Sequence, residues 1–330
     1  MKTIAITTGD PAGVGPEIVR KSIRYYPLHP EINYIIYGDG FLPPGFNFIR
    51  SDRELDGSHH DRSKIRIIDN PGQISDRCQL YTIIIPSTGV QPGKPDKNAG
   101  RSAYQILQRV VKDIKEYEME ALVTSPVSKK SIREYDPEFI GHTEFLAREF
   151  STSNFVMNFI SEKFDVALLT THTSLQTVTA QIKEELIIPK IRLIFHFAQK
   201  RYQNARVALL GLNPHCGEEG VFGTEEIVLK NAINQLRKEG ITIDGPFPAD
   251  SFFRYKIHDY RQVIACYHDQ GLIPFKMSAG EEGVNVTLGL PFFRASVDHG
   301  TGYDIAGKGI ASQKSLNSAL DLTGKIITLD

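Results

Sequence analysis

Short apolar stretches alternate with polar or glycine-rich loops along most of the chain, and longer amphipathic stretches follow several of them. The short stretches have the length and the Val, Ile and Leu content of buried strands. They predict strands at Lys2–Thr8, Asn33–Tyr37, Ile65–Ile68, Leu80–Ile85, Ala121–Thr124, Phe155–Ile160, Val166–Leu169, Ala205–Leu210 and Val263–Cys266. Val166–Leu169 and Ala205–Leu210 are each followed by a loop of small residues. Phe155–Ile160 and Val166–Leu169 are expected to be neighbours.

The longer stretches carry apolar residues at helical spacing. They predict helices at Pro16–Tyr26, Gly100–Tyr117, Ile187–Tyr202 and Thr224–Glu239. Asn98 is expected to cap the second and Gly240 to stop the fourth, while Ile243–Asp250 is expected to be a loop. Strand, loop and helix repeat in this order, so the sequence predicts an α/β protein with a largely parallel sheet.

The stretch from Cys266 to Lys308 differs from both a core strand and a surface loop. Val, Leu and Phe residues alternate in it with His, Asp, Lys, Asn and Arg, and glycines divide it. This mixture is typical of strands that end at a functional site, with the site residues on the following loops.

Composition limits the class of protein. The length of 330 residues suits two domains, and a content of 41% hydrophobic and 23% charged residues is ordinary for a globular protein. A net charge of -1 gives no general attraction to nucleic acid or to an anionic membrane. No apolar run reaches the ~18 residues of a membrane helix, and the first residues resemble a strand rather than a signal peptide. Three scattered cysteines, Cys78, Cys216 and Cys266, do not form a disulfide framework. We therefore expect a cytoplasmic enzyme.

Three histidines, His172, His215 and His268, each follow an apolar strand and enter a loop of small residues. Ligands of open α/β sheets collect at the carboxyl ends of strands, and three imidazoles there could bind a divalent ion. The alternative is that each histidine separately forms hydrogen bonds within its own loop. Three equivalent positions favour the metal.

Two further groups have candidate chemistry. Lys276, Asn285 and Arg294 lie among apolar strand residues and could bind an anionic substrate; ordinary surface charge is the alternative. Ser296–Gly309 combines glycines with His, Thr and Asp, which suits either the adenosine of a dinucleotide or a plain glycine loop. The first glycine-rich turn, Gly9–Glu17, lacks the dinucleotide spacing and is interpreted as a tight turn.

Several segments together resemble the 4-hydroxythreonine-4-phosphate dehydrogenase family of vitamin B6 biosynthesis. In chain order they are TTGDPAGVGPE, TSPVSKKSI, GHTEF, TTHTSL, GLNPHCGEEG, GTEEI, PAD, YHDQGLIPFK and GVNVTLGLPFFRASVDHGTGYDIAGKG. The last of these is also similar to the adenosine-binding loop of isocitrate and isopropylmalate dehydrogenases. The resemblance runs from residue 7 to the C-terminal helix and is weakest at residues 40–95.

The resemblance implies an isocitrate/isopropylmalate dehydrogenase-like fold with two α/β/α subdomains around a cleft. Residues 1–128 and 268–330 would form the terminal subdomain with the cofactor loop. Residues 129–267 would form the central subdomain, with metal ligands and the dimer interface. The family is homodimeric, and the third histidine of each metal site, His268 here, comes from the partner subunit.

The resemblance also assigns residues. His172, His215 and His268 would hold zinc, cobalt or magnesium, and the substrate would contact His142, Thr143, Lys276, Asn285 and Arg294. His299, Gly300, Thr301 and Asp304 would bind NAD or NADP. Asp250 and Asp269 are candidates for proton transfer or for supporting the metal ligands.

The activity implied is oxidation of 4-phosphooxy-L-threonine at C3, with NAD as hydride acceptor. Decarboxylation then gives 3-amino-2-oxopropyl phosphate. Close relatives oxidise 4-phosphothreonate or 4-phosphoerythronate, and no single residue separates these substrates. A metal-dependent hydrolase would leave the Ser296–Gly309 loop unexplained. A non-catalytic metal-binding module would have no use for the anion-binding residues.

Overall fold

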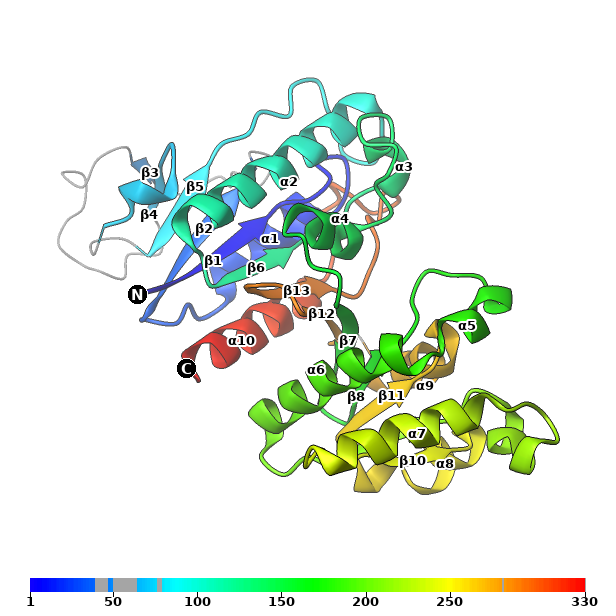
Figure 1. Cartoon of the computed structure of the whole chain (residues 1–330). Helices are drawn as coiled ribbons and strands as arrows, with labels where there is room; N and C mark the ends of the chain where they lie inside the picture. Colours follow the sequence, from blue (N-terminus) through cyan, green and yellow to red (C-terminus); the bar gives the residue numbers. More distant parts are fainter. Residues whose placement is uncertain (39–46, 50–63, 76–78, 281, 330) are drawn as a thin grey trace. The chain divides into compact units, whose positions relative to one another are not determined.

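A computed structural model describes residues 1–38, 47–49, 64–75, 79–280 and 282–329 (Figure 1). The chain divides into two compact units, Met1–Ser151 with Pro291–Asp330 (unit 1) and Thr152–Leu290 (unit 2). Unit 1 is therefore built from both ends of the chain. The boundaries between the two compact units fall after residues 151 and 290. The subdomain limits after residues 128 and 267 remain a prediction from the resemblance. Cys78 lies outside the described residues.

The strands of unit 1 are all parallel. Their order is β13 (Phe293–Val297), β6 (Ala121–Thr124), β1 (Lys2–Thr7), β2 (Ile32–Tyr37), β5 (Leu80–Ile83), β4 (Lys64–Ile67) and β3 (Asn47–Ile49). Every residue of β2, β5 and β6 is buried. Burial on both faces explains why these strands are continuous apolar runs in the sequence rather than alternating ones.

Helices cover the strands of unit 1. They are α1 (Gly15–Tyr25), α2 (Lys97–Tyr117), α3 (Lys129–Ile132), α4 (His142–Glu149) and α10 (Lys314–Thr328), with a short 3-10 turn at Pro71–Gln73. In Figure 1 α2 runs along the strands, and it packs on β1, while α10 packs on β13 and β6. The predicted Asn98 cap of α2 is wrong: the N-cap is Asp96, two residues earlier, whose carboxylate accepts the Ala99 N–H at 2.8 Å.

Unit 2 has a mixed sheet. Its order is β10 (Asp244–Phe247), β9 (Val207–Leu210), β11 (Gln262–Ala265), β8 (Asp165–Leu168), β7 (Val156–Ile160) and β12 (Val284–Leu288). The first four are parallel, and β7 is antiparallel to both β8 and β12. The predicted pairing of the strands near Phe155 and Val166 is confirmed. Because β9, β11 and β8 are parallel neighbours, the segments that follow them and carry the three histidines leave the same edge of the sheet.

The helices of unit 2 are α5 (Leu175–Gln181), α6 (Glu184–Tyr202), α7 (Glu225–Lys238), α8 (Ala249–Tyr255) and α9 (His268–Ala279), with 3-10 segments at Pro214–Gly220 and Ile257–Asp259. A buried aromatic cluster anchors α8 and α9 to the sheet. Phe275 of α9 packs against Phe159 and Phe164, and Phe252 of α8 stacks on Phe247. This packing fixes α9, whose first residue is His268.

Two local predictions in unit 2 are wrong. Ile243–Asp250 is not a loop, because β10 and the start of α8 occupy it. Gly245 and Pro246 hid the strand, which lies at the end of the sheet order where proline is tolerated. His268 and Lys276 lie on α9 rather than in a loop or between strand residues. The α/β class itself is confirmed. Within the described ranges, no helix combines the length and apolar character needed to cross a membrane.

Candidate functional site

Unit 1 brings together three predicted substrate residues. Arg294 lies on β13, and His142 and Thr143 open α4. The Arg294 guanidinium donates to the Thr143 hydroxyl at 3.4 Å and to the Thr124 hydroxyl at 2.8 Å. The Arg294 residue is only 2% exposed. A planar cation held this way at a helix start suits a phosphate or carboxylate group.

Burial governs the charge of this cluster. It lowers the pKa of Arg294 to about 10, against the opposing effect of the Glu144 carboxylate, so the guanidinium stays charged at neutral pH. Burial also lowers the pKa of His142 well below its usual range, and the nearby charges of Arg294 and Lys129 lower it further. His142 is therefore neutral at neutral pH. Its buried Nε2 has no hydrogen-bond partner among the described residues, so it could serve a bound anion.

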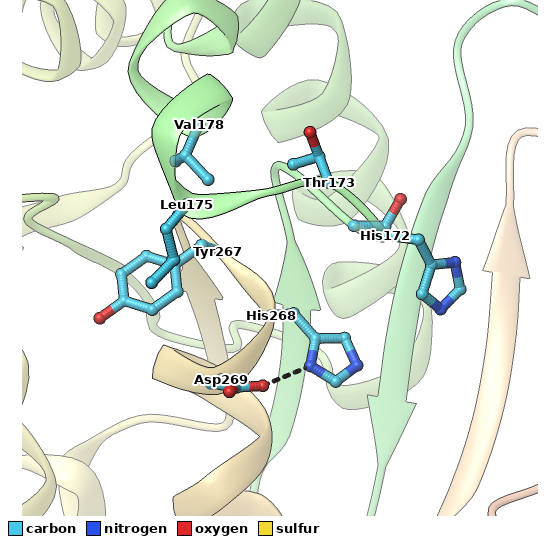
Figure 2. Close-up of a pocket in the computed structure, with 8 residues that line it drawn as sticks. His172, Thr173, Leu175, Val178, Tyr267, His268 and Asp269 are labelled. Carbon is cyan, nitrogen blue, oxygen red and sulfur yellow. Dashed lines mark hydrogen bonds and ion pairs between the residues drawn. The ribbon is translucent and has the colours of Figure 1, made fainter.

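Unit 2 brings together two of the three predicted metal ligands. The rings of His172 and His268 have centroids 6.0 Å apart and planes tilted by 40°. Both line a pocket of about 250 Å³, shown in Figure 2, with Leu175, Val178 and Tyr267 on the side away from the imidazoles. Two imidazoles bound to one ion, each through a nitrogen about 2.0–2.1 Å from it, would have centroids roughly 5–6 Å apart. The pair therefore fits a shared ion.

Asp269 supports this arrangement. Its carboxylate lies 2.7 Å from His268 Nδ1 (Figure 2). A carboxylate that accepts one ring N–H leaves the other ring nitrogen free to ligate and fixes the orientation of the ring. Of the two roles predicted for Asp269, the geometry favours supporting the ligand His268.

His215 does not join the pair. It lies in the Pro214–Gly220 segment that follows β9, where residues 215–219 all have positive φ. Among the described residues, no three His, Cys, Asp or Glu side chains are grouped closely enough to hold a metal. Asp250, exposed in the first turn of α8, is close enough to this segment to raise the pKa of the Cys216 thiol, a smaller effect than burial. The described part of the chain thus brings two of the three predicted ligands together and leaves the third out of that group.

Lys276 and Asn285 also lie in unit 2. Lys276 is exposed on α9, eight residues after His268, and Asn285 is half-buried on β12. Each has an interaction partner in the structure. Both belong to unit 2, while the Arg294 cluster belongs to unit 1.

The four predicted cofactor residues lie in one loop of unit 1, after β13. His299 and Gly300 are exposed, Thr301 is half-buried and Asp304 is exposed. A side chain at Gly300 would meet nothing within 4 Å. The loop therefore has an open face along which a nucleotide could lie, so these residues fit a dinucleotide.

Comparison with known proteins assigns the family. A family model described as "Pyridoxal phosphate biosynthetic protein PdxA" matches residues 47–323. The chain belongs to the PdxA family. It is 38% identical to the 4-hydroxythreonine-4-phosphate dehydrogenase of Sulfurihydrogenibium sp. (strain YO3AOP1), covering 98% of this chain and 97% of the relative. It is 34% identical to the D-threonate 4-phosphate dehydrogenase of Bordetella bronchiseptica, covering 98% and 92%.

A solved structure of the same family agrees. The 4-hydroxythreonine-4-phosphate dehydrogenase of Klebsiella pneumoniae superposes with a TM-score of 0.79 at 34% identity, over 99% of both chains. The predicted family and the dehydrogenase-like α/β fold are confirmed, and so is a dehydrogenase as the class of enzyme.

Two polar residues of this PdxA family member were missed in the sequence. Lys129, at the start of α3, lies over Gly141: a methyl group on Gly141 would be 3.8 Å from its ammonium nitrogen. Lys190 of α6 donates to the Leu169 carbonyl at 2.5 Å, three residues before His172, and burial lowers the pKa of its ammonium. The TSPVSKKSI motif was a signal for Lys129, while Lys190 lies in an ordinary amphipathic helix and had none.

Proposed function

We propose that this protein oxidises the C3 hydroxyl of 4-phosphooxy-L-threonine with NAD, and that the resulting β-keto acid loses CO₂ to give 3-amino-2-oxopropyl phosphate for vitamin B6 synthesis. The observation that carries the proposal is the buried Arg294 cluster. A charged guanidinium beside a neutral histidine and a helix start suits a small phosphorylated acid. The name of the Sulfurihydrogenibium relative, at 38% identity over nearly the whole chain, points to the same substrate.

In this proposal the Arg294 cluster binds the anionic groups of the substrate. Thr143 and the backbone at the start of α4 donate to the phosphate, and neutral His142 donates through Nε2. Arg294 neutralises the phosphate or carboxylate charge, and its bonds to Thr124 and Thr143 keep its fork in one orientation. Lys276 and Asn285 are the proposed further contacts to substrate.

A divalent ion, zinc, cobalt or magnesium, would be held by His172, His268 and His215. When bound, such an ion supplies Lewis acidity that favours loss of the hydroxyl proton. The residues of this chain prepare that step: Asp269 orients His268, and Lys190 holds the strand end that leads to His172. Asp250, near the His215 segment, is the proposed acceptor of the proton.

NAD, or NADP, would lie along the loop with His299, Gly300, Thr301 and Asp304. The nicotinamide supplies the hydride acceptor. The exposed backbone around Gly300 allows a close approach of the nucleotide.

We also propose that the working enzyme is a homodimer with shared active sites. Within one chain the paired ligands are His172 and His268, so the ligand left for the partner subunit to supply is the one at His215. This differs from the expectation from resemblance, in which His268 crosses to the partner.

A second candidate keeps the site and changes the substrate to 4-phosphothreonate. The 34% identity to the Bordetella bronchiseptica D-threonate 4-phosphate dehydrogenase favours it. The two substrates differ by a hydroxyl in place of an amine, and both carry the phosphate and carboxylate that the Arg294 cluster suits.

NAD reduction by the chelator-stripped protein tests these proposals. Each substrate is supplied with and without zinc, cobalt or magnesium. Metal-dependent NADH formation with 4-phosphooxy-L-threonine is the expected result, with release of one CO₂ per NADH. Preference for 4-phosphothreonate would select the second candidate. Failure to form NADH from either substrate, with the metal bound, would reject the dehydrogenase proposal and favour a metal-dependent hydrolase.

A further inference from the structure

The first glycine-rich turn and the proposed cofactor loop, about 290 residues apart in sequence, are bonded to each other within unit 1. The Val14 N–H donates to the Thr301 carbonyl at 2.8 Å. The Tyr303 hydroxyl donates to the Asp10 carboxylate at 2.6 Å. The other oxygen of Asp10 accepts the Ala12 N–H at 2.9 Å. Asp10 therefore joins the shape of the first turn to the position of Tyr303.

The turn is shaped for this contact. A methyl group on Gly13 would lie 2.7 Å from the Thr301 carbonyl oxygen, so only glycine allows the two backbones to approach so closely. Asp10 is completely buried, and Tyr303 is half-buried. The Gly9–Glu17 turn thus has a structural role, because the loop packs on it.

A second attachment holds the far end of the loop. The Glu17 carboxylate accepts the N–H groups of Ala311 at 2.8 Å and Gly309 at 3.2 Å. The Lys21 ammonium donates to the carbonyls of the same two residues at 2.6 and 3.0 Å, and it pairs with Glu17 at 3.0 Å. Both residues lie on α1, one turn apart, so a single helix face fixes Gly309 and Ala311.

Between and beside these attachments the loop stays open. A side chain at Gly300 or Gly309 would meet nothing within 4 Å, and His299 and Lys308 are exposed. One side of the loop is therefore bonded to the first turn and α1, and the other side is free for a ligand.

From this geometry we infer that Asp10, Tyr303 and Glu17 are positioning residues for the dinucleotide: they hold the 299–311 loop in its binding conformation without touching the nucleotide. This inference rests on the proposed function, since it assigns the loop to NAD or NADP. A loop held in its bound shape before binding loses less conformational entropy when the ligand arrives. Loosening it should weaken nucleotide binding and leave the chemical step unchanged.

The test uses the full-length Tyr303→Phe variant, which removes one hydroxyl and leaves the ring. NADH and NADPH binding is measured by nucleotide fluorescence, without substrate turnover. We expect the Kd of the nucleotide that binds wild type more tightly to rise roughly tenfold, the scale of one hydrogen bond to a charged group. The KM for NAD should rise similarly, with kcat and the KM for the phosphorylated substrate unchanged.

Three comparisons sharpen the test. Tyr135→Phe is the matched control, because its hydroxyl bonds the Lys97 carbonyl at 2.9 Å in the same unit, away from the loop. Asp10→Asn keeps an oxygen for the Ala12 N–H and an amide for the Tyr303 hydroxyl, so it should weaken nucleotide binding less than Asp10→Ala. Trypsin cleavage after exposed Lys308 reports loop opening in the free protein, and it should quicken in Tyr303→Phe and Glu17→Gln but not in Tyr135→Phe.

Two results would overturn the inference. If cleavage after Lys308 quickens while nucleotide affinity stays at the wild-type value, the bonds serve only the fold. If affinity and cleavage both match wild type, the bonds do not hold the loop. Failure of the wild-type protein itself to bind either nucleotide would instead reject the proposed function, and the inference with it.

Discussion

Burial determines what Arg294 can do. The Arg294 residue is only 2% exposed, and its guanidinium donates to the hydroxyls of Thr124 and Thr143. Burial lowers its pKa to about 10, although the nearby Glu144 carboxylate acts in the opposite direction. Burying a cation costs free energy, and a bound anion would recover part of that cost. The residue therefore makes more sense as part of a binding site than as part of the core.

Replacing Arg294 by lysine should keep the positive charge and remove the planar guanidinium with its several donors. The three donors of lysine share one nitrogen, so they cannot reach Thr124, Thr143 and an anion in the spread, planar arrangement of a guanidinium. We expect kcat/KM for the phosphorylated substrate to fall about 10- to 100-fold, the scale of one or two charge-assisted hydrogen bonds, mainly through KM. Steady-state kinetics measures this. Arg133→Lys is the control, since the Arg133 guanidinium donates to the Phe139 carbonyl in the same unit; an equal loss there would reject the assignment.

His142 predicts a dependence of stability on pH. Burial lowers its pKa in the folded protein, so below pH of about 6.5 the unfolded chain takes up a proton that the folded chain resists. The stability present above this pH is therefore lost as pH falls towards the folded pKa. His142→Gln lacks this titration. We expect the difference in Tm, wild type minus variant, to shrink between pH 8 and pH 5.5 in thermal unfolding. A constant difference would mean that His142 titrates normally.

At the scale of elements, the His215 segment has an unusual backbone. His215, Cys216, Glu218 and Glu219 all have positive φ, which costs about 1–2 kcal/mol per residue for side chains other than glycine. The first turn of α7 holds the segment: Glu226 accepts the Asn213 N–H at 2.7 Å and its side-chain amide at 3.0 Å. Glu226 is 4% exposed. The hydrogen bonds to Glu226 hold this strained backbone in place. Backbone strain of this kind is typical of functional sites, so we expect the orientation of the His215 side chain to affect function.

Gly217→Ala should disrupt this scaffold. The new methyl group would lie 2.7 Å from a Glu226 carboxylate oxygen and 2.8 Å from the Gly223 carbonyl oxygen. Gly220→Ala is the matched control, because Gly220 also has positive φ, at +102°, and open space around it. We expect Gly217→Ala to lower the free energy of unfolding by about 1–3 kcal/mol more than Gly220→Ala, measured by urea denaturation. It should also weaken zinc binding in a chelator competition. Equal effects would show that only the backbone angle matters.

These elements also show how far the sequence could be read. The strand near Val166 and the helix that ends at Tyr117 follow from local patterns of apolar residues, so both could be predicted. The left-handed turn at His215 is bonded to Glu226 through Asn213, and the proposed cofactor loop is bonded to Asp10, nearly 300 residues away in sequence. Periodicity carries no information on such contacts. The strand at Asp244 was hidden for another reason, since Gly245 and Pro246 lower the strand propensity of an edge position.

At the scale of the whole molecule, the proposed homodimer leads to a testable choice of which histidine the partner subunit would supply. His172 and His268 follow the adjacent strands β8 and β11, and their rings lie 6.0 Å apart in one chain. His215 follows β9, on the other side of β11, and is not grouped with them in the described part of the chain. Suppose that the partner subunit completes each site. A mixed dimer of two inactive variants then has one intact site only if the two mutated ligands come from different subunits in each site.

Mixed dimers therefore distinguish the arrangements. Unfolding and refolding His172→Ala with His215→Ala should restore about a quarter of wild-type activity, because half of the randomly assorted twofold dimers are mixed and each has one intact site. His172→Ala mixed with His268→Ala should restore nothing, since one chain supplies both ligands. The opposite pattern would mean that His268 crosses, as the resemblance implies. If neither mixture recovers activity while the separately refolded wild type does, each chain holds its own metal, and the His215 segment must move to reach the other two ligands.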